Sequence, residues 1–291
     1  MVCHLLFYER KEAKKMIEVK GLTKKYGPHT AIEDLNFTIE KGNVYGFLGP
    51  NGAGKSTTMN IMTGCLALTE GTVTIDGFDI VKNPVEAKRR IGYLPEIPPV
   101  YLDMTVEEYL LFVAKVKGVV KEELQAQVDS ALERTKTAGV RTRLIKHLSK
   151  GYRQRVGIAQ AIIGNPEIII LDEPTVGLDP KQIIEIRELI RELGKSHTVI
   201  LSSHILSEIK SVANRMLIIS RGKIVENDTA ENIEKKYGSN LEEVFLKLTE
   251  QTYEIEALER EEAEAKDKSA VVGSDAADST QAEAQSGKEA D

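Results

Sequence analysis

The fold of this chain is decided by the stretch Val44-Tyr45-Gly46-Phe47-Leu48-Gly49-Pro50-Asn51-Gly52-Ala53-Gly54-Lys55-Ser56. Residues 44–48 predict a buried strand, and residues 49–56 fit the pattern G-x-x-x-x-G-K-[ST] between a strand and a helix. In this pattern successive backbone N–H groups surround phosphate oxygens, and the positive end of the following helix favours their charge. Lys55 is expected to reach the β and γ phosphates, and Ser56 to offer its hydroxyl to Mg²⁺. The stretch predicts a nucleoside triphosphate site comprising Gly49, Asn51, Gly52, Gly54, Lys55, Ser56 and Thr57.

Two carboxylates follow a second apolar strand further along the chain. Ile168-Ile169-Ile170-Leu171 leads directly into Asp172 and Glu173. A strand end beside a phosphate loop is where a Mg²⁺-orienting aspartate belongs, so Asp172 is predicted to be a metal ligand. Glu173 is predicted to accept a proton from, or polarise, the attacking water. Carboxylates also cap strand ends for structural reasons, and only their pairing with the phosphate loop indicates hydrolysis.

The segments around these motifs alternate between strand-like and helix-like patterns. Strands are predicted at Ile17–Lys20, Ile32–Ile39 and Thr198–Leu201, and a helix at Pro180–Leu193. Between about Pro95 and Asn165 the pattern is helical, and Thr105 with Glu108 forms a capping-box signature. Strands alternating with helices predict an α/β fold with a parallel sheet core and a helical insert.

Charge and composition divide the chain into three parts. Residues 254–291 hold twelve Asp/Glu and four Lys/Arg, a net charge of -8, so the other 253 residues carry +2 of the total of -6. A net charge this close to zero gives no electrostatic argument for nucleic-acid binding. We expect a disordered leader at 1–15, a folded domain at 16–250 and a disordered acidic tail at 251–291. A short charged helix over Glu254–Lys268 is the alternative for part of the tail.

Cysteine usage and hydropathy indicate a reducing compartment and no membrane span. Cys3 and Cys65 form neither a disulfide framework nor a metal motif. The most apolar stretch, around Leu110–Val120, is interrupted by Lys115 and Lys117. Residues 2–8 are apolar but lack the flanking features of a secretion signal. The sequence therefore favours a cytoplasmic location.

The segment Leu148-Ser149-Lys150-Gly151-Tyr152-Arg153-Gln154-Arg155-Val156 is specific enough to suggest a family. It resembles the signature sequence Leu-Ser-Gly-Gly-Gln of the ATPase subunits of ABC transporters, and the resemblance covers about Met16 to Glu250. By itself the segment would be a helix start capped by Ser149. The resemblance implies that Ser149 and Gly151 contact the γ phosphate of ATP held by the opposite subunit.

Other family elements follow in the expected order. Tyr26 resembles the aromatic residue that stacks on adenine, and His204 resembles the histidine that senses the γ phosphate. Asp179 resembles the aspartate that crosses the dimer interface, although before Pro180 it would cap a helix in any protein. The resemblance implies a P-loop NTPase of the ABC class. Such a fold has a mixed or parallel core sheet, an antiparallel β subdomain and a helical subdomain, here at about 96–165.

Two departures from the family pattern stand out. Tyr93-Leu94-Pro95-Glu96 ends in a glutamate where the family usually has glutamine. Glu96 is still expected to contact Mg²⁺, directly or through water, while adding negative charge near the γ phosphate. Lys150 and Tyr152 replace the first glycine and the glutamine of the signature, whereas Ser149 and Gly151 are retained.

The function implied by the resemblance is ATP hydrolysis in a head-to-tail dimer, with Lys55, Glu173 and His204 as catalytic residues. The dimer would be a homodimer, or a pair with a related ATPase, bound to the inner face of the cell membrane through a separate permease. Similarity to subunits of ABC-2 type exporters favours export. The alternatives are a soluble ABC ATPase acting on ribosomes or DNA, and a binding module without hydrolysis. A single cassette in which Leu148 lies only 93 positions after Lys55 disfavours the first, and the intact catalytic residues disfavour the second.

Overall fold

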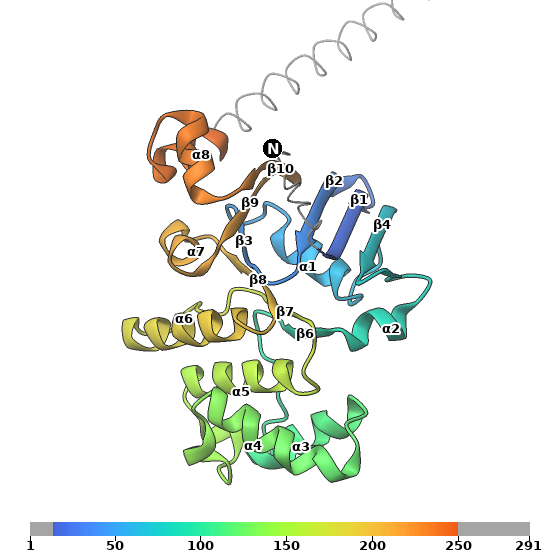
Figure 1. The fold of residues 1–291 in the computed structure, drawn as a ribbon, viewed down its shortest axis with the longest axis vertical. Coiled ribbons are helices and arrows are strands. Elements are labelled where there is room, and N and C mark those ends of the chain that lie inside the picture. The colour runs from blue at the N-terminus through green and yellow to red at the C-terminus, as the bar shows by residue number, and fades with distance from the viewer. Residues whose placement is uncertain (1–13, 250–291) are drawn as a thin grey trace, which may run out of the picture. The chain divides into compact units, whose positions relative to one another are not determined.

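The computed structural model describes residues 14–249. Of these, residues 14–244 belong to one compact unit, and residues 245–249 belong to a second. The expected acidic tail at 251–291 and all but the last two residues of the expected leader lie outside the described residues. The folded domain described below is the first unit (Figure 1).

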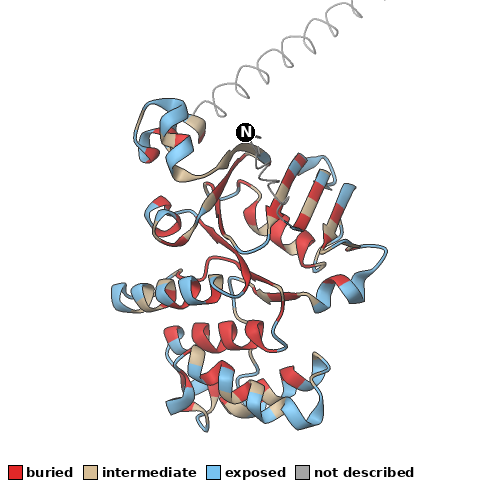
Figure 2. Cartoon of the chain, viewed as in Figure 1, coloured by how far each residue is buried: buried red, intermediate tan, exposed pale blue. Residues whose placement is uncertain are grey.

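A six-stranded sheet runs through the middle of the domain in the order β10-β9-β3-β8-β7-β6. Five of its strands are mutually parallel, and only the edge strand β10 pairs antiparallel. Every residue of three inner strands is buried, as expected for parallel strands covered on both faces (Figure 2). The strand bounds are β3 Val44–Leu48, β6 Ile91–Leu94, β7 Ile168–Leu171, β8 Thr198–Ser203, β9 Arg215–Ser220 and β10 Lys223–Asp228. The predicted parallel α/β core is confirmed.

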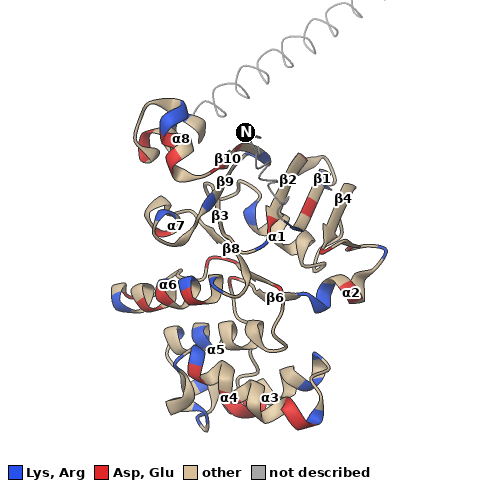
Figure 3. Ribbon diagram, in the orientation of Figure 1, with Lys and Arg blue, Asp and Glu red and all other residues tan. Residues whose placement is uncertain are grey.

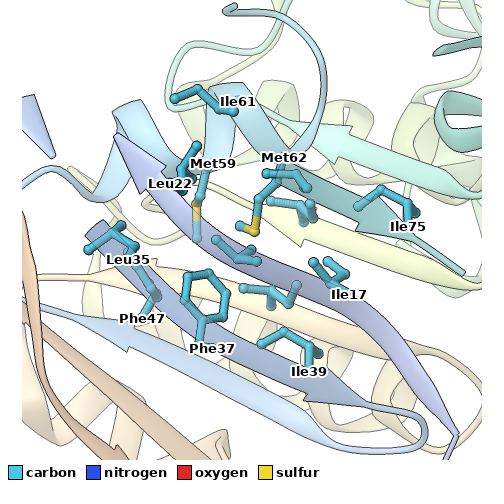
Figure 4. Packing of buried hydrophobic residues seen from close by; sticks show 14 of the residues in the cluster. Ile17, Leu22, Leu35, Phe37, Ile39, Phe47, Met59, Ile61, Met62 and Ile75 are labelled. Atoms are coloured by element: carbon cyan, nitrogen blue, oxygen red, sulfur yellow. The ribbon is translucent and has the colours of Figure 1, made fainter. Parts of the chain in front are cut away.

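A second, four-stranded antiparallel sheet has the order β2-β1-β4-β5. Its strands are β1 Lys15–Tyr26, β2 His29–Glu40, β4 Glu70–Ile75 and β5 Phe78–Asp79. Alternating residues of β1 and β2, such as Ile17 and Phe37, point into a shared core (Figure 4). Met59 and Met62 of helix α1 (Lys55–Met62) fill that core from the other side. The apolar core therefore fixes the helix that begins at Lys55.

Helices α3, α4 and α5 form a separate layer at one end of the domain (Figure 1). Helix α3 begins with the predicted capping box, in which Thr105 and Glu108 bond to each other's backbone N–H groups. Three short 3₁₀ turns lie at 121–123, 138–140 and 145–147. The remaining helices flank the sheets. The α-helix bounds are α2 Pro84–Arg89, α3 Val106–Val116, α4 Leu124–Arg134, α5 Lys150–Ile162, α6 Pro180–Gly194, α7 Leu206–Val212 and α8 Ala230–Tyr237.

Helix α5 is held close to the core sheet at its C-terminal end. A Cβ on Gly92 of β6 would lie 2.1 Å from the carbonyl oxygen of Ala161, so only glycine permits this approach. The Lys117 ammonium donates to the carbonyl oxygens of Gln160, Ala161 and Ile163 at 2.7, 3.0 and 2.8 Å. These bonds satisfy acceptors that a helix end leaves unpaired. The position of α5 relative to the sheet is thereby fixed.

Charged side chains lie mainly on the peripheral helices and loops, while the central strands carry almost none (Figure 3). Across residues 14–249, no helix combines the length and apolarity that a membrane span requires.

Candidate nucleotide-binding site

The phosphate loop connects β3 to α1 in a conformation that requires glycine. Gly54 has φ +103°, and a Cβ there would lie 3.0 Å from the Ala31 carbonyl oxygen. A Cβ on Gly49 would lie 2.2 Å from the carbonyl oxygen of Ile219. Helix α1 begins at Lys55 with no side-chain cap on its N-terminus. The first N–H groups of the helix therefore remain available to an anionic ligand.

Lys55 is folded into this loop and is only 6% exposed. Its ammonium donates to the carbonyl oxygens of Gly49 and Pro50 at 2.8 and 3.2 Å. One carboxylate oxygen of Glu173 lies 3.6 Å away. Burial lowers the pKa of Lys55, whereas the charge of Glu173 opposes that shift. A ligand phosphate would replace these contacts with a stronger counter-charge for a cation that is already desolvated.

Asp172 and Glu173 leave the end of β7 in different directions. The Ser202 hydroxyl donates to Asp172 at 2.6 Å and accepts from the backbone N–H of Glu173 at 2.7 Å. Glu173 has φ +47°, an uncommon conformation for a residue with a Cβ. That backbone turn directs its carboxylate to His204, whose Nδ1 lies 3.1 and 3.2 Å from the two oxygens. The strand end thus brings a cation, two carboxylates and a histidine together.

A cavity of about 480 Å³ opens in front of these groups. Ten of the residues predicted from the sequence line it: Tyr26, Asn51, Gly52, Gly54, Lys55, Ser56, Thr57, Glu96, Glu173 and His204. Asp172 is not part of the lining and is 2% exposed. Gly49 also lies behind the lining, where its carbonyl holds Lys55. The cavity is large enough for a nucleotide-sized ligand.

The aromatic wall of the cavity lies on the turn between β1 and β2. Tyr26 is 48% exposed, and the Lys24 ammonium lies 5.0 Å from its ring centroid. His29 also lines the cavity, directly opposite Tyr26 in the strand register, together with Ala31 and Val176. Sequence reasoning missed these three lining residues. His29 could have been predicted from the hairpin, because it pairs with Tyr26 and residues opposite each other on adjacent strands are neighbours.

Ser149, Gly151 and Asp179 lie outside the lining of this cavity. Ser149 caps α5 by accepting from Tyr152 N at 3.3 Å, and Asp179 caps α6 by accepting from Gln182 N at 2.9 Å. The two helix starts are close together, since a Cβ on Gly151 would meet the Gln182 side chain at 2.4 Å. Within one chain, these residues therefore form a second polar cluster that lies outside the cavity.

Two of the three residues that depart from the family pattern, Glu96 and Lys150, line a neighbouring groove of about 530 Å³. Glu96 and Val176 belong to both hollows, and Lys150 lines the groove. A Cβ on Gly177 would lie 2.1 Å from the Lys150 ammonium, so this side chain crosses the turn that follows Glu173. The substitutions at positions 96 and 150 therefore face one space at the edge of the cavity.

Comparison with known proteins identifies the family. A family model described as ABC transporter matches residues 32–176. The bacitracin transport ATP-binding protein BcrA of Bacillus licheniformis is 38% identical over 247 residues, 84% of this chain and 79% of that protein. The chain belongs to the family of ABC transporter ATP-binding subunits.

Solved structures of ABC ATP-binding subunits share its fold. One, an ATP-binding subunit of an ABC transporter, has a TM-score of 0.74 at 30% identity, covering 80% of this chain and 99% of that one. Another is a dimeric ATP-binding cassette bound to ADP and phosphate. It has a TM-score of 0.67 at 27% identity and covers 74% of this chain and 98% of that one. The expected fold is therefore confirmed: an ABC-class P-loop NTPase with a mixed core sheet, an antiparallel β subdomain and helices.

Proposed function

We propose that this ABC ATP-binding subunit hydrolyses ATP in a head-to-tail dimer and thereby drives export through a separate permease. The observation that carries the proposal is the meeting of Lys55, Glu173 and His204 at one cavity. A residue set that only bound nucleotide would not need a buried carboxylate held against a histidine. The pairing therefore supports hydrolysis over simple binding.

Each of these side chains has a distinct part in the proposed reaction. The Lys55 ammonium and the N-terminus of α1 bind the phosphates, and Tyr26 stacks on adenine. Glu173 accepts the proton of the attacking water as its oxygen bonds to the γ phosphorus and the bond to ADP breaks. His204 holds the Glu173 carboxylate in place and contacts the γ phosphate. The products are ADP and inorganic phosphate.

The chain also offers an oxygen donor set suited to Mg²⁺. Within residues 14–249 no group of three or more His, Cys, Asp or Glu side chains forms a metal cage. Mg²⁺ usually binds through one or two protein oxygens, together with water and substrate phosphates, so the absence of a cage fits this ion. Ser56, Asp172 and Glu96 would hold it. When bound, it would neutralise charge that develops on the phosphate oxygens.

Completion of the site requires a second subunit. Ser149, Gly151 and Asp179 lie outside the cavity of their own chain. Helix α5 has thirteen residues, and the first turn contains no acidic residue. Its N-terminus can therefore face an anion. Ser149 and Gly151 would contact the γ phosphate held by the opposite subunit. The dimeric cassette bound to ADP and phosphate supports this assembly.

The groove beside Glu96 supports contact with a permease. Ile97, at its edge, is 82% exposed, and Pro98, Val100 and Leu102 add apolar surface. Gln154 is 3% exposed, and its Nε2 has no hydrogen-bond partner in the described part of the chain. A cytoplasmic permease segment with apolar side chains and a free carbonyl or carboxylate would satisfy both features. The name of BcrA, a bacitracin transport ATP-binding protein, supports transport as the process that is driven, and export is the direction proposed here.

Two measurements test this proposal. The purified chain is expected to hydrolyse ATP in the presence of Mg²⁺, and failure to do so with its permease present would refute the enzymatic part. Ile97→Asp should abolish co-purification with a multispanning membrane protein. Val81→Asp is the matched control, because Val81 is also exposed but lies outside the groove. Equal retention of the permease by both variants would refute the docking surface.

A further inference from the structure

One buried carboxylate is not used by the proposed reaction. Glu208 lies on α7 and is 5% exposed. The other buried residues of this short helix are Leu206, Ile209 and Val212, so Glu208 is the charged member of an apolar face. Burying a carboxylate costs free energy unless hydrogen bonds and an opposite charge compensate it. The contacts of Glu208 therefore show what its burial serves.

A single oxygen of Glu208 joins the loop that follows β7 to Ser203, the last residue of β8, from which the loop of His204 leaves. Its Oε2 accepts from the Thr175 hydroxyl at 2.7 Å and from the Ser203 hydroxyl at 2.9 Å. The Ser203 hydroxyl in turn accepts from the backbone N–H of Ile205 at 3.0 Å. The other oxygen, Oε1, lies 3.6 Å from Arg187 Nη2 on α6. Helices α6 and α7 lie side by side, so α6 supplies the compensating charge (Figure 1).

The two loops joined in this way carry the two groups that meet in the cavity. Thr175 lies two residues after Glu173, and Ser203 immediately precedes His204. Glu173 and His204 touch directly at 3.1 Å, and Ser202 bridges the same two strand ends on the other side. Glu208 thus forms a third link between the loops, after the Glu173–His204 contact and the Ser202 bridge, and it does not line the cavity. The residues of the Ser202 and Glu208 links are buried, whereas the His204 side chain is 38% exposed.

We infer that Glu208 is a positioning residue that holds the loop of Glu173 and the loop of His204 in register for hydrolysis. The inference rests on the proposed hydrolytic function. Hydrogen bonds to a buried charge are stronger and more directional than contacts between apolar side chains. Glu208 does not line the cavity, and its side-chain partners Thr175, Ser203 and Arg187 lie outside the phosphate loop. Its effect is therefore on the spacing of Glu173 and His204, and ATP binding does not depend on it.

The test compares kcat with KM for ATP in variants of this network. Thr175→Val keeps the shape of the side chain and removes one link without changing charge. We expect kcat to fall on the order of 10-fold and KM to change less than about 3-fold, because one hydrogen bond to a charged group is lost. Glu208→Leu removes both links and should lower kcat further. Glu208→Gln retains an oxygen for both hydroxyls and should recover part of the loss.

A double variant and a control separate positioning from general destabilisation. Thr175→Val should cost nothing more in the Glu208→Leu background if Thr175 acts through Glu208. Asp76→Asn is the control, because Asp76, in the turn between β4 and β5, has a carboxylate that is 8% exposed and pairs with Lys14 and Arg90. It should lower the melting temperature and leave kcat unchanged. The same fall in kcat for Asp76→Asn, or normal kcat in both Thr175→Val and Glu208→Leu, would overturn the inference. Lack of hydrolysis by the unaltered protein would instead refute the proposed function.

Discussion

Changing Glu173 to glutamine tests the centre of the proposed reaction. The substitution keeps the shape of the side chain and removes its negative charge and its ability to accept a proton. In the unaltered protein the carboxylate lies 3.1 Å from His204 Nδ1 and 3.6 Å from the Lys55 ammonium. Lys55 is also held by other bonds, since it donates to the carbonyl oxygens of Gly49 and Pro50. The loop should therefore keep its conformation in the variant.

Two magnitudes follow from these distances. At 3.6 Å and an effective dielectric constant of about 20, the Lys55–Glu173 attraction is roughly 4–5 kcal/mol before desolvation. That attraction competes with a ligand phosphate for Lys55, so its removal should leave ATP affinity unchanged or raise it. Loss of a general base typically lowers a rate about 10²- to 10⁴-fold, or roughly 3–5 kcal/mol of activation free energy. The rate of hydrolysis should therefore fall while the affinity for ATP is maintained or rises.

The assay measures ATP turnover and the size of the protein in ATP and in ADP. We expect the Glu173→Gln protein to elute as a dimer in ATP and as a monomer in ADP, because in the proposed dimer ATP would join Lys55 of one subunit to Ser149 of the other. Glu167→Gln is the matched control. Glu167 immediately precedes β7, just as Asp172 and Glu173 follow it, and it pairs at the surface with Lys41. The control should hydrolyse ATP normally.

A Glu173→Gln protein that turns over ATP at the normal rate would remove Glu173 from the catalytic role. A variant that loses both hydrolysis and ATP binding would show that the carboxylate holds the site together, which contradicts the separation of binding from chemistry.

Two further predictions concern the pKa of Lys55 and the packing of α5 against the core sheet. Burial lowers the pKa of Lys55, and the negative charge of Glu173 opposes that shift. Glu173→Gln should therefore lower the pKa of Lys55 further. Because the protonated amine binds phosphate, the loss of ATP affinity on raising the pH should then begin at a lower pH than in the unaltered protein. Calorimetric titration across alkaline pH checks this, and coincident curves would contradict it. Gly92→Ala should destabilise the fold by about 1–3 kcal/mol, since its Cβ meets the Ala161 backbone, whereas Gly139→Ala meets nothing within 4 Å. Denaturant unfolding compares the two, and equal midpoints would refute the predicted clash.

The sequence by itself determined the parts of this protein that depend on short spacing. The phosphate loop at 49–56 is recognisable because strand, glycines and lysine are adjacent in the chain. The caps at Thr105, Ser149 and Asp179 are confirmed, since a cap bonds only to residues two or three positions away. The apolar run before Asp172 predicted a buried strand for the same local reason.

Only the tertiary structure decided which distant residues meet. No spacing in the sequence gives the strand order β10-β9-β3-β8-β7-β6, which places the end of β7 beside the end of β8. That neighbourhood brings His204 to Glu173, and it buries Glu208 between Thr175 and Ser203. In the sequence Glu208 is one of 45 acidic residues, and nothing in its immediate neighbours distinguishes it from the others. Its burial depends on the packing of α7 against α6 and the sheet, because burial and partner choice are set by contacts between segments far apart along the chain.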